Sequence, residues 1–526
     1  MKSPVVRFLC QAVYGLLVLV LALAVFVFGR AAWVFRDRTG GYSLSVAVDA
    51  RKSAADPKPF RVGFGREDIT PPVGAGHPPV WVAGFQNDHA ASGVHDPLFA
   101  VATALDDGHT RVGLVVLDSI GFFHDDVVAV RRAVPASAKF DYVIVCATHN
   151  HSTPDLMGLW GPTWKLPVAI PIPGVGKLEE LPRSGVNPEY RAKVIAAAAK
   201  ALTAAAGSLQ PAKVALHEIA VSPAGLVKDT REPQVFDSDL RLMLFTQPDT
   251  GAVLGSIVGW GNHPETPWSK NRELTADFCG VIRDALERGI AYDGQTRLKG
   301  LGGTHVFVNG CVGGLMTTHP SVTVRDPFLG TDVKEPSHDK TRALGNSLAK
   351  LLLERVAASN APATAVVPLG VQAHTLELPL ANQGFFAAAM LGLFERGHSR
   401  FGFLRTEVAF LTVGEASIAC IPGEIYPELV NGGVIRAPGG DFDIEPLEIP
   451  PIRDLMPGKV KFLFGLANDE IGYIVPKSQW DVAPPHTLHG GNAPYGEVNS
   501  VGPDTAFQLH SAIRELIRDA GQSARP

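Results

Sequence analysis

Short runs of apolar residues, rich in valine and isoleucine, recur along the chain and alternate with segments of helical periodicity. Continuous apolar runs of this kind are typical of strands that are covered on both faces of a sheet. They predict strands at residues 111–118, 141–148, 255–262, 304–310 and 416–423. Helical patterns occupy residues 188–207, 278–289 and 341–359. The mixture predicts an α/β fold with a central, mostly buried mixed sheet that is flanked by helices.

The first 40 residues have a different pattern. Residues 8–29 form a run of 22 uncharged, mostly apolar residues, which is long enough to span a bilayer as a helix. A cleaved signal peptide is the alternative, but its apolar region is usually shorter and ends in small residues, whereas this run ends in VFVFGRAAWVF. We therefore predict one N-terminal transmembrane helix, an uncleaved anchor within residues 1–39, followed by a linker at 40–60. A large downstream domain translocates regardless of its charge, so we expect the domain to be extracytoplasmic.

Residues 61–520 contain no internal repeat and no break in composition, and we expect them to form one domain. Long stretches rich in proline and glycine lie at 160–187, 318–340, 434–458 and 476–500, and loops of that length often build a site. Residues 384–394 (GFFAAAMLGLF) are apolar nearly all round but too short to cross a bilayer. They predict a buried helix, with an apolar surface for a lipid tail or a membrane as the alternative.

Charge and cysteine content exclude several classes of protein. The formal net charge is -5 and no basic run is interleaved with aromatic residues, so the pattern of a nucleic-acid-binding protein is missing. There are five cysteines and no C-x-x-C, which gives no basis for a disulfide framework or a thiolate zinc site. Lipids and small molecules remain the expected partners.

Polar residues with metal-binding side chains follow three of the predicted strands. His149 and His151 come directly after the strand at 141–148, and in an extended backbone side chains two residues apart point to the same side. The alternative is that they are ordinary polar residues at a strand end. A buried carboxylate after another strand, Glu424, needs a partner, which can be a metal or an arginine.

The third strand end carries His263, with Glu265 as a second possible ligand two residues later. A His-Pro sequence at a strand end is also an ordinary entry into a loop, so this segment alone is ambiguous. Together the three strand ends offer two histidines and one carboxylate. That set suits zinc with one position open for water.

Nine short segments of the chain match, in the same order, the motifs of one protein family. They are VGFGREDITPP (62–72), GVHDPLFAVATALDDG (93–108), THNHS (148–152), NHPE (262–265), ADFCG (276–280), NGCVGG (309–314), IPGE (421–424), LANDEIGYIVP (466–476) and YGEVNSVGPDTA (495–506). In this order they resemble the catalytic domain of the neutral/alkaline (non-lysosomal) ceramidase family. The resemblance covers most of residues 61–510.

The resemblance implies a site. In the family, zinc is held by the first His of the His-x-His motif, a later His, the Glu of the Pro-Gly-Glu turn and a Tyr in a Gly-Tyr segment. Carried over to this chain, the zinc ligands are His149, His263, Glu424 and Tyr473. The resemblance further implies that His151 transfers protons, that Arg231 contacts the reacting carbonyl and that Tyr495 also lies at the site. Arg231 or Tyr495 would stabilise the developing oxyanion. The alternative for the arginine and the tyrosines is structural pairing or packing.

The chain departs from the family pattern at two places. The family serine of a Ser-Asn-x-Gly-Asp loop is replaced by Gly310, and the aspartate by Gly314, so we expect no serine-dependent mechanism. Cys311 lies one residue over and would face the other way on an extended strand. Only about 20 residues follow the last motif, so we expect the family's C-terminal β-sandwich to be absent.

From this resemblance we expect a membrane-anchored, zinc-dependent hydrolase acting on a linear amide, the N-acyl bond of ceramide or a related lipid. The products would be a fatty acid and an amine base. Two alternatives stay open: a zinc hydrolase acting on a different amide or ester, and a catalytically silent, membrane-tethered binding protein.

Overall fold

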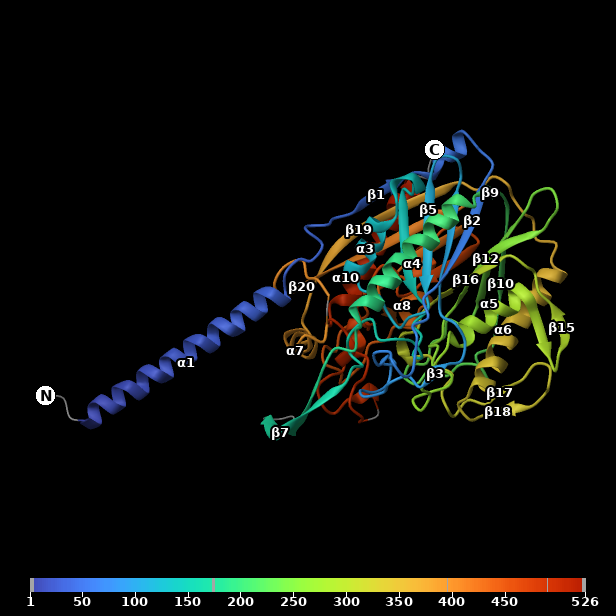
Figure 1. Cartoon of the computed structure of the whole chain (residues 1–526). Coiled ribbons are helices and arrows are strands. Elements are labelled where there is room, and N and C mark those ends of the chain that lie inside the picture. Colours follow the sequence, from blue (N-terminus) through green and yellow to red (C-terminus); the bar gives the residue numbers. More distant parts are fainter. Residues whose placement is uncertain (1–3, 173–175, 395, 490, 523–526) are drawn as a thin grey trace.

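Three mixed sheets form the centre of the computed structural model, which describes residues 4–172, 176–394, 396–489 and 491–522 (Figure 1). The first sheet has the order β6 (Tyr142–Ala147), β5 (Arg111–Leu117), β4 (Phe99–Asp106), β2 (Arg61–Asp68), β9 (Gln210–Pro211). Strands β5 and β6 are parallel and the other neighbours are antiparallel.

The other two sheets repeat this combination of antiparallel neighbours and one parallel pair. The second has the order β1 (Ser45–Val48), β19 (Leu369–Pro379), β20 (Phe403–Val413), β21 (Ala416–Cys420), β23 (Val460–Phe464), with β21 and β23 parallel. The third has the order β10 (Lys213–Ile219), β11 (Leu240–Thr246), β12 (Val253–Trp260), β16 (Thr304–Asn309), with β12 and β16 parallel.

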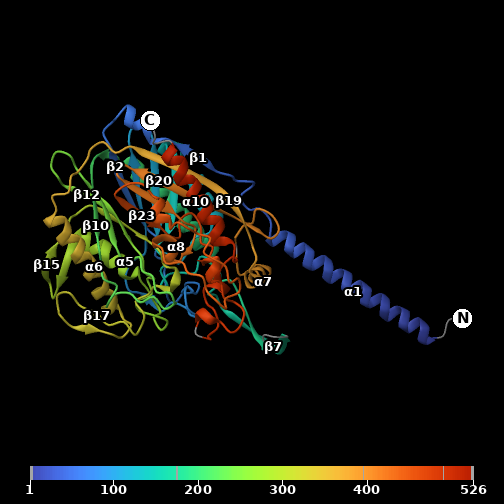
Figure 2. The same ribbon diagram turned by 180° about the vertical axis from the view of Figure 1, so that it is seen from behind.

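The inner faces of all three sheets share one apolar core, which contains Val116, Phe245, Val308, Leu411 and Phe464. Helices cover the outer faces: α3 (His124–Ala133) and α4 (Pro188–Gly207) on the first sheet, α5 (Asp277–Arg288) and α6 (His338–Ala358) on the third, and α10 (Thr505–Gln522) on β19 and β20. Figure 2 shows α10 across the face of the second sheet. Three short helices are α2 (Ala50–Ala55), α8 (Pro427–Asn431) and α9 (Ile452–Leu455).

The predicted α/β fold is confirmed, and the predicted strands and helices match β5, β6, β12, β16, β21, α4, α5 and α6 to within a few residues at their ends. The sequence predicted one central sheet, whereas the structure has three. Antiparallel partners such as β11 and β20 lie beside the apolar strands and divide them among separate sheets. The apolar runs are therefore buried between sheets as well as under helices.

The predicted linker at residues 40–60 is wrong, because this segment is part of the folded domain. Strand β1 pairs antiparallel with β19, from Ser45 opposite His374 to Val48 opposite Val371. Helix α2 follows, with the side chain of Asp49 accepting a hydrogen bond from the amide of Arg51 as its N-cap. The alternating SVAV sequence suits an edge strand, and pairing covers the free edge of β19.

Ahead of β1, helix α1 (Pro4–Val34) extends away from the domain (Figure 1). Its residues Val6–Val34 are long and apolar enough to cross a membrane, and the most apolar window makes no buried contact with the domain. The segment predicted from residues 384–394 forms α7 (Gln383–Leu391), which is half-buried and not fully buried as expected.

Several short pairs complete the fold, and one of them corrects the expectation that residues 160–187 are irregular. Strands β7 (Thr163–Ile172) and β8 (Gly176–Pro182) form a hairpin there, which projects from the domain on the side of α1 and α7 (Figure 1). The other pairs are β3 (Gly93–Val94) with β13 (Glu273–Leu274), β14 (Gly289–Tyr292) with β15 (Gln295–Lys299), β17 (Val324–Arg325) with β18 (Asp332–Val333), and β22 (Glu424–Ile425) with β24 (Tyr473–Ile474).

Candidate metal centre and active site

The carboxyl ends of strands from all three sheets meet at one place. His149 follows β6, His263 follows β12 and Glu424 follows β21. Asn309, at the end of β16, donates from Nδ2 to the carbonyls immediately before the two histidines, those of Thr148 and Asn262, at 2.9 Å each. A single amide therefore fixes the two histidine loops relative to each other.

The backbone of His149 has a positive φ of 64°, which is uncommon for a residue with a side chain. The prediction that His149 and His151 point to the same side assumed an extended backbone, and this assumption is wrong. The chain turns at His149 because its neighbours bond back to the loop after β5, Thr148 N to Leu117 O and Asn150 N to Ser119 O. The two imidazoles nevertheless converge, with ring centroids 5.0 Å apart.

The two predicted histidine ligands face one carboxylate. Nδ1 of His149 bonds the carbonyl of Ile120 and Nδ1 of His263 bonds that of Met316, both at 2.8 Å. A carbonyl only accepts, so Nδ1 carries the proton and Nε2 keeps a lone pair. The Nε2 atoms lie 3.3 Å and 3.1 Å from Oε2 of Glu424. With both Nε2 atoms unprotonated, three acceptors face one centre and repel one another unless a cation or an added proton lies between them. This set of ligand atoms fits zinc.

His151 lies beside this centre. Its Nε2 is 3.4 Å from Nε2 of His149, and its Nδ1 is 3.4 Å from a carboxylate oxygen of Glu265. The ring occupies the space where a Cβ of Gly84 would stand, so the loop must have glycine there. Burial lowers the pKa of His151 well below 6.5, which keeps the imidazole neutral. The ligand atoms of the three histidines lie within 4.8 Å of one another, so His151 is placed either to bind a metal or to exchange a proton beside it.

Both predicted tyrosines lie on the same side of the centre. Strands β22 and β24 pair in parallel with Tyr473 opposite Glu424, and the tyrosine hydroxyl bonds that carboxylate. Burial and the charge of Glu424 raise the pKa of Tyr473 well above 10. The ring of Tyr495 lies 5.8 Å from that of Tyr473 and is 51% exposed, at the rim of the site.

A cavity of about 100 Å³ adjoins the centre. His149, His151, Glu424 and both tyrosines line its polar end, and the rest of its wall is mostly apolar, from Phe123, Met157, Leu380, Phe385, Ala389 and Phe394. Helix α7 supplies Phe385 and Ala389, so the apolar segment at 384–394 forms part of this wall.

One buried acid in the cavity wall was not singled out from the sequence. Glu470 is 2% exposed, and one of its oxygens accepts a hydrogen bond from the amide of Gly472 at 2.7 Å. Burial and the nearby Glu424 raise the pKa of Glu470 well above its usual range. The only signal in the sequence is that this acid lies three residues before Tyr473.

The structure does not bring Arg231 into the cavity. Its guanidinium donates to the carbonyl of Gln479 at 2.8 Å, pairs with Glu497 at 3.3 Å and Glu428 at 3.7 Å, and lies over the ring of Tyr426. Both carboxylates and the arginine are buried. These contacts favour the structural alternative for Arg231 over contact with a reacting carbonyl.

We therefore expect Arg231→Ala to lower the free energy of unfolding by about 3–5 kcal/mol, because two buried carboxylates lose their partner. Chemical denaturation measures this, with Arg325→Ala as a control that breaks an exposed pair with Asp332 and leaves stability unchanged. Unaltered stability with a large loss of turnover would instead support the contact with the carbonyl.

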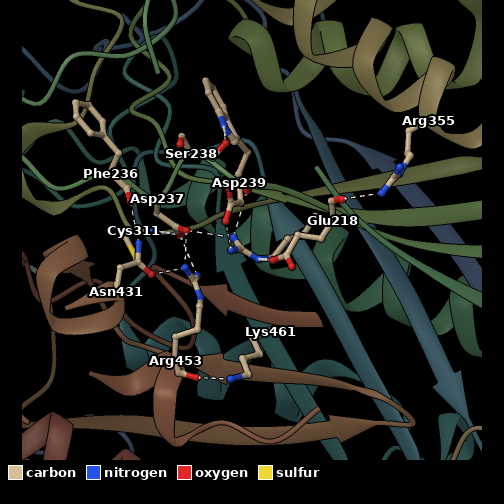
Figure 3. A network of polar contacts seen from close by, with 12 residues as sticks. Glu218, Phe236, Asp237, Ser238, Asp239, Cys311, Arg355, Asn431, Arg453 and Lys461 are labelled. Atoms are coloured by element: carbon tan, nitrogen blue, oxygen red, sulfur yellow. Dashed lines mark hydrogen bonds and ion pairs between the residues drawn. The ribbon is translucent and has the colours of Figure 1, made fainter. Parts of the chain in front are cut away.

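Gly310, at the position that matches the family serine, lies beside Asp237. This carboxylate belongs to a buried ion network, which Figure 3 shows. A Cβ at Gly310 would lie 2.9 Å from Oδ2 of Asp237, a carboxylate that pairs with Arg453 at 2.8 Å and Arg241 at 3.1 Å. A larger side chain must displace a carboxylate that two arginines hold. Cys311 is fully buried next to it, and burial raises the pKa of its thiol well above 9, so it is not a nucleophile.

A second group of possible ligands among the described residues differs in geometry. His95, Glu273 and His338 lie near one another on the surface, with the two rings stacked 3.6 Å apart and only 9° from parallel. A nitrogen lone pair lies in the plane of its ring, so parallel rings do not direct both lone pairs at one ion. At the first centre the rings of His149 and His263 are 70° apart, which lets their lone pairs converge.

The fold is similar to those of two solved ceramidase structures. Neutral ceramidase from Pseudomonas aeruginosa aligns over 89% of this chain and 75% of its own with a TM-score of 0.61 and 14% sequence identity. A ceramidase complexed with C2 aligns over 89% and 76% with a TM-score of 0.60 and the same identity. No family model matches the chain. The resemblance drawn from the sequence is thus confirmed at the level of the fold.

Proposed function

We propose that the chain is a membrane-anchored, zinc-dependent hydrolase that cleaves the N-acyl amide bond of ceramide or a related lipid. The observation that carries the proposal is the convergence of three acceptor atoms, from His149, His263 and Glu424, at the polar end of an apolar cavity. An amide suits the polar end and an acyl chain suits the apolar wall. The similarity to solved ceramidases supports the same chemical class.

The residues proposed to hold zinc are His149, His263, Glu424 and Tyr473. Zinc bound there lowers the pKa of a water molecule and polarises the amide carbonyl. The backbone carbonyls of Ile120 and Met316 fix the two histidine rings in the required orientation.

His151 is proposed to move the proton. Its neutral imidazole directs Nε2 at the centre, where it accepts a proton and returns it to the leaving nitrogen. The carboxylate of Glu265, near Nδ1, stabilises the charged form of the ring. Tyr495, at the rim, is the remaining candidate for donating a hydrogen bond to the developing oxyanion.

Helix α1 is proposed as the anchor, with the domain outside the cytoplasm. Its exposed apolar length supports a membrane span, because the most apolar window of the helix is not buried against the domain. An anchored enzyme has its lipid substrate in the same membrane.

The test is a metal and activity measurement on the full chain purified in detergent. We expect about one zinc per chain by elemental analysis, release of fatty acid from ceramide in mixed micelles, loss of activity on chelation and its return with added zinc. A folded, zinc-free protein, or one that hydrolyses ceramide equally well after chelation, would contradict the proposal. Activity confined to short water-soluble amides or esters would support the alternative substrate class.

A further inference from the structure

The inner end of helix α1 is packed into the wall of the cavity. Val34 and Phe35 are buried in one apolar cluster together with Phe123, Met157 and Phe394, three residues that line the cavity. The ring of Phe35 also packs edge-on against His398, another lining residue, at 4.7 Å. One layer of side chains therefore separates the end of the apolar helix from the cavity.

Polar contacts fix this junction. Nε of Arg30, at the end of the apolar run, donates to the carbonyl of Met390 in α7 at 3.0 Å. Just beyond the helix, Asp37 pairs with Arg405 of β20 at 3.0 Å. The ring of Phe35 stacks on Phe386 of α7 at 4.6 Å. The end of α1 and helix α7 are thus held together as one unit.

The length of the exposed apolar run places this unit at a membrane surface. Nearly all residues from 8 to 28 are exposed. A helix of these 21 residues, at about 1.5 Å per residue, is about 32 Å long, close to the roughly 30 Å of a bilayer's hydrocarbon core. Arg7 and Arg30 bound the run and fall at its two interfaces. Helix α7, bonded to Arg30, then lies at the level of the lipid headgroups.

Apolar side chains are exposed on this same side of the domain. We define the interfacial patch as Trp33, Trp164, Val168, Leu391 and Phe401, each of which is 54–74% exposed. They come from the end of α1, the β7–β8 hairpin, α7 and the turn before β20, and Figure 1 shows α7 and the hairpin on the side from which α1 leaves. Exposed aromatic residues near a membrane span are typical of the interfacial layer.

We propose that the interfacial patch is a second membrane-contact surface, which lies in the interfacial layer of the bilayer that α1 crosses and holds the apolar end of the cavity against that bilayer. The occupant is a lipid surface, because the patch adjoins the end of the membrane span. Phe401 packs edge-on against Phe35 at 5.1 Å, and Trp33 and Leu391 lie on α1 and α7, the two helices that meet there. The inference rests on the proposed anchoring by α1 but not on the chemistry of the site.

The test measures the depth of single spin labels on the full chain reconstituted in phosphatidylcholine vesicles. Of the five cysteines only Cys10 is exposed, so Cys10→Ser gives a background in which the four buried cysteines stay unlabelled. Labels are introduced by Val168→Cys, Leu391→Cys and Phe401→Cys. Leu19→Cys, in the middle of α1, reports insertion of the helix.

Leu329→Cys is the aqueous control, because Leu329 is exposed between β17 and β18, at the end of the domain away from α1 in both views. We expect the patch labels to collide with dissolved oxygen and to lose collisions with a water-soluble nickel complex, as Leu19 does and Leu329 does not. Patch labels as accessible to nickel as Leu329, with Leu19 protected, overturn the contact surface and leave the anchor intact. Nickel access at Leu19 overturns both.

Discussion

Replacing His149 by alanine is expected to remove zinc and abolish hydrolysis while the protein stays folded. The imidazole supplies one of the three converging acceptors, and the hydrogen bond from its other nitrogen to the carbonyl of Ile120 holds the ring in the ligand orientation. Loss of an outer-shell partner costs about 10–100-fold in metal affinity, and we expect loss of the ligand itself to exceed the upper figure.

Zinc per chain by elemental analysis, fatty-acid release and thermal unfolding together test this prediction. His217→Ala is the matched control: His217 is also buried, but it lies in β10 outside the site, and its loss is expected to leave zinc bound. Full zinc occupancy in His149→Ala would remove His149 from the ligand set.

His151→Gln is expected to retain zinc, unlike His149→Ala, and to reduce kcat by roughly 10²–10⁴-fold. The side chain lies next to the centre, and its Nδ1 is 3.4 Å from a carboxylate oxygen of Glu265, which can stabilise the protonated ring. Its expected function is proton transfer, so KM should change little.

Elemental analysis and steady-state kinetics on the same preparation decide this prediction. Simultaneous loss of zinc and turnover would make His151 a third histidine ligand, which the spacing of the three imidazoles also permits. His149→Ala and His151→Gln therefore divide the His-x-His motif into a metal ligand and a proton carrier, or show that the division is wrong.

Much of the site could be predicted because it depends on strand ends. A buried strand that ends in a histidine or a glutamate is visible as an apolar run followed by a polar residue, and this was enough to find His149, His263 and Glu424. Tyr473, predicted as a ligand, and Tyr495, predicted as a catalytic residue, required the resemblance to a family, since no local pattern in the sequence marks either tyrosine.

What could not be predicted depends on contacts between distant segments. Arg231 has Asp237 and Asp239 near it in sequence, but its partners are Glu428 and Glu497, which no local pattern connects to it. The positive φ of His149 is imposed by hydrogen bonds to the loop after β5, and side-chain periodicity assumes a regular backbone. Pairing of β1 with a strand more than 300 residues later could not be predicted for the same reason.

That pairing has a consequence for how the protein is made. Strand β1 leaves the ribosome early, and its partner begins at residue 369, about 320 residues after β1 ends at residue 48. At about 5–20 residues per second, the edge of the second sheet cannot close for roughly 16–64 seconds after β1 has been synthesised. Throughout that time the nascent chain holds an unpaired apolar strand close to its membrane helix. Elongation speed and chaperone occupancy on this segment should therefore affect the yield of folded protein.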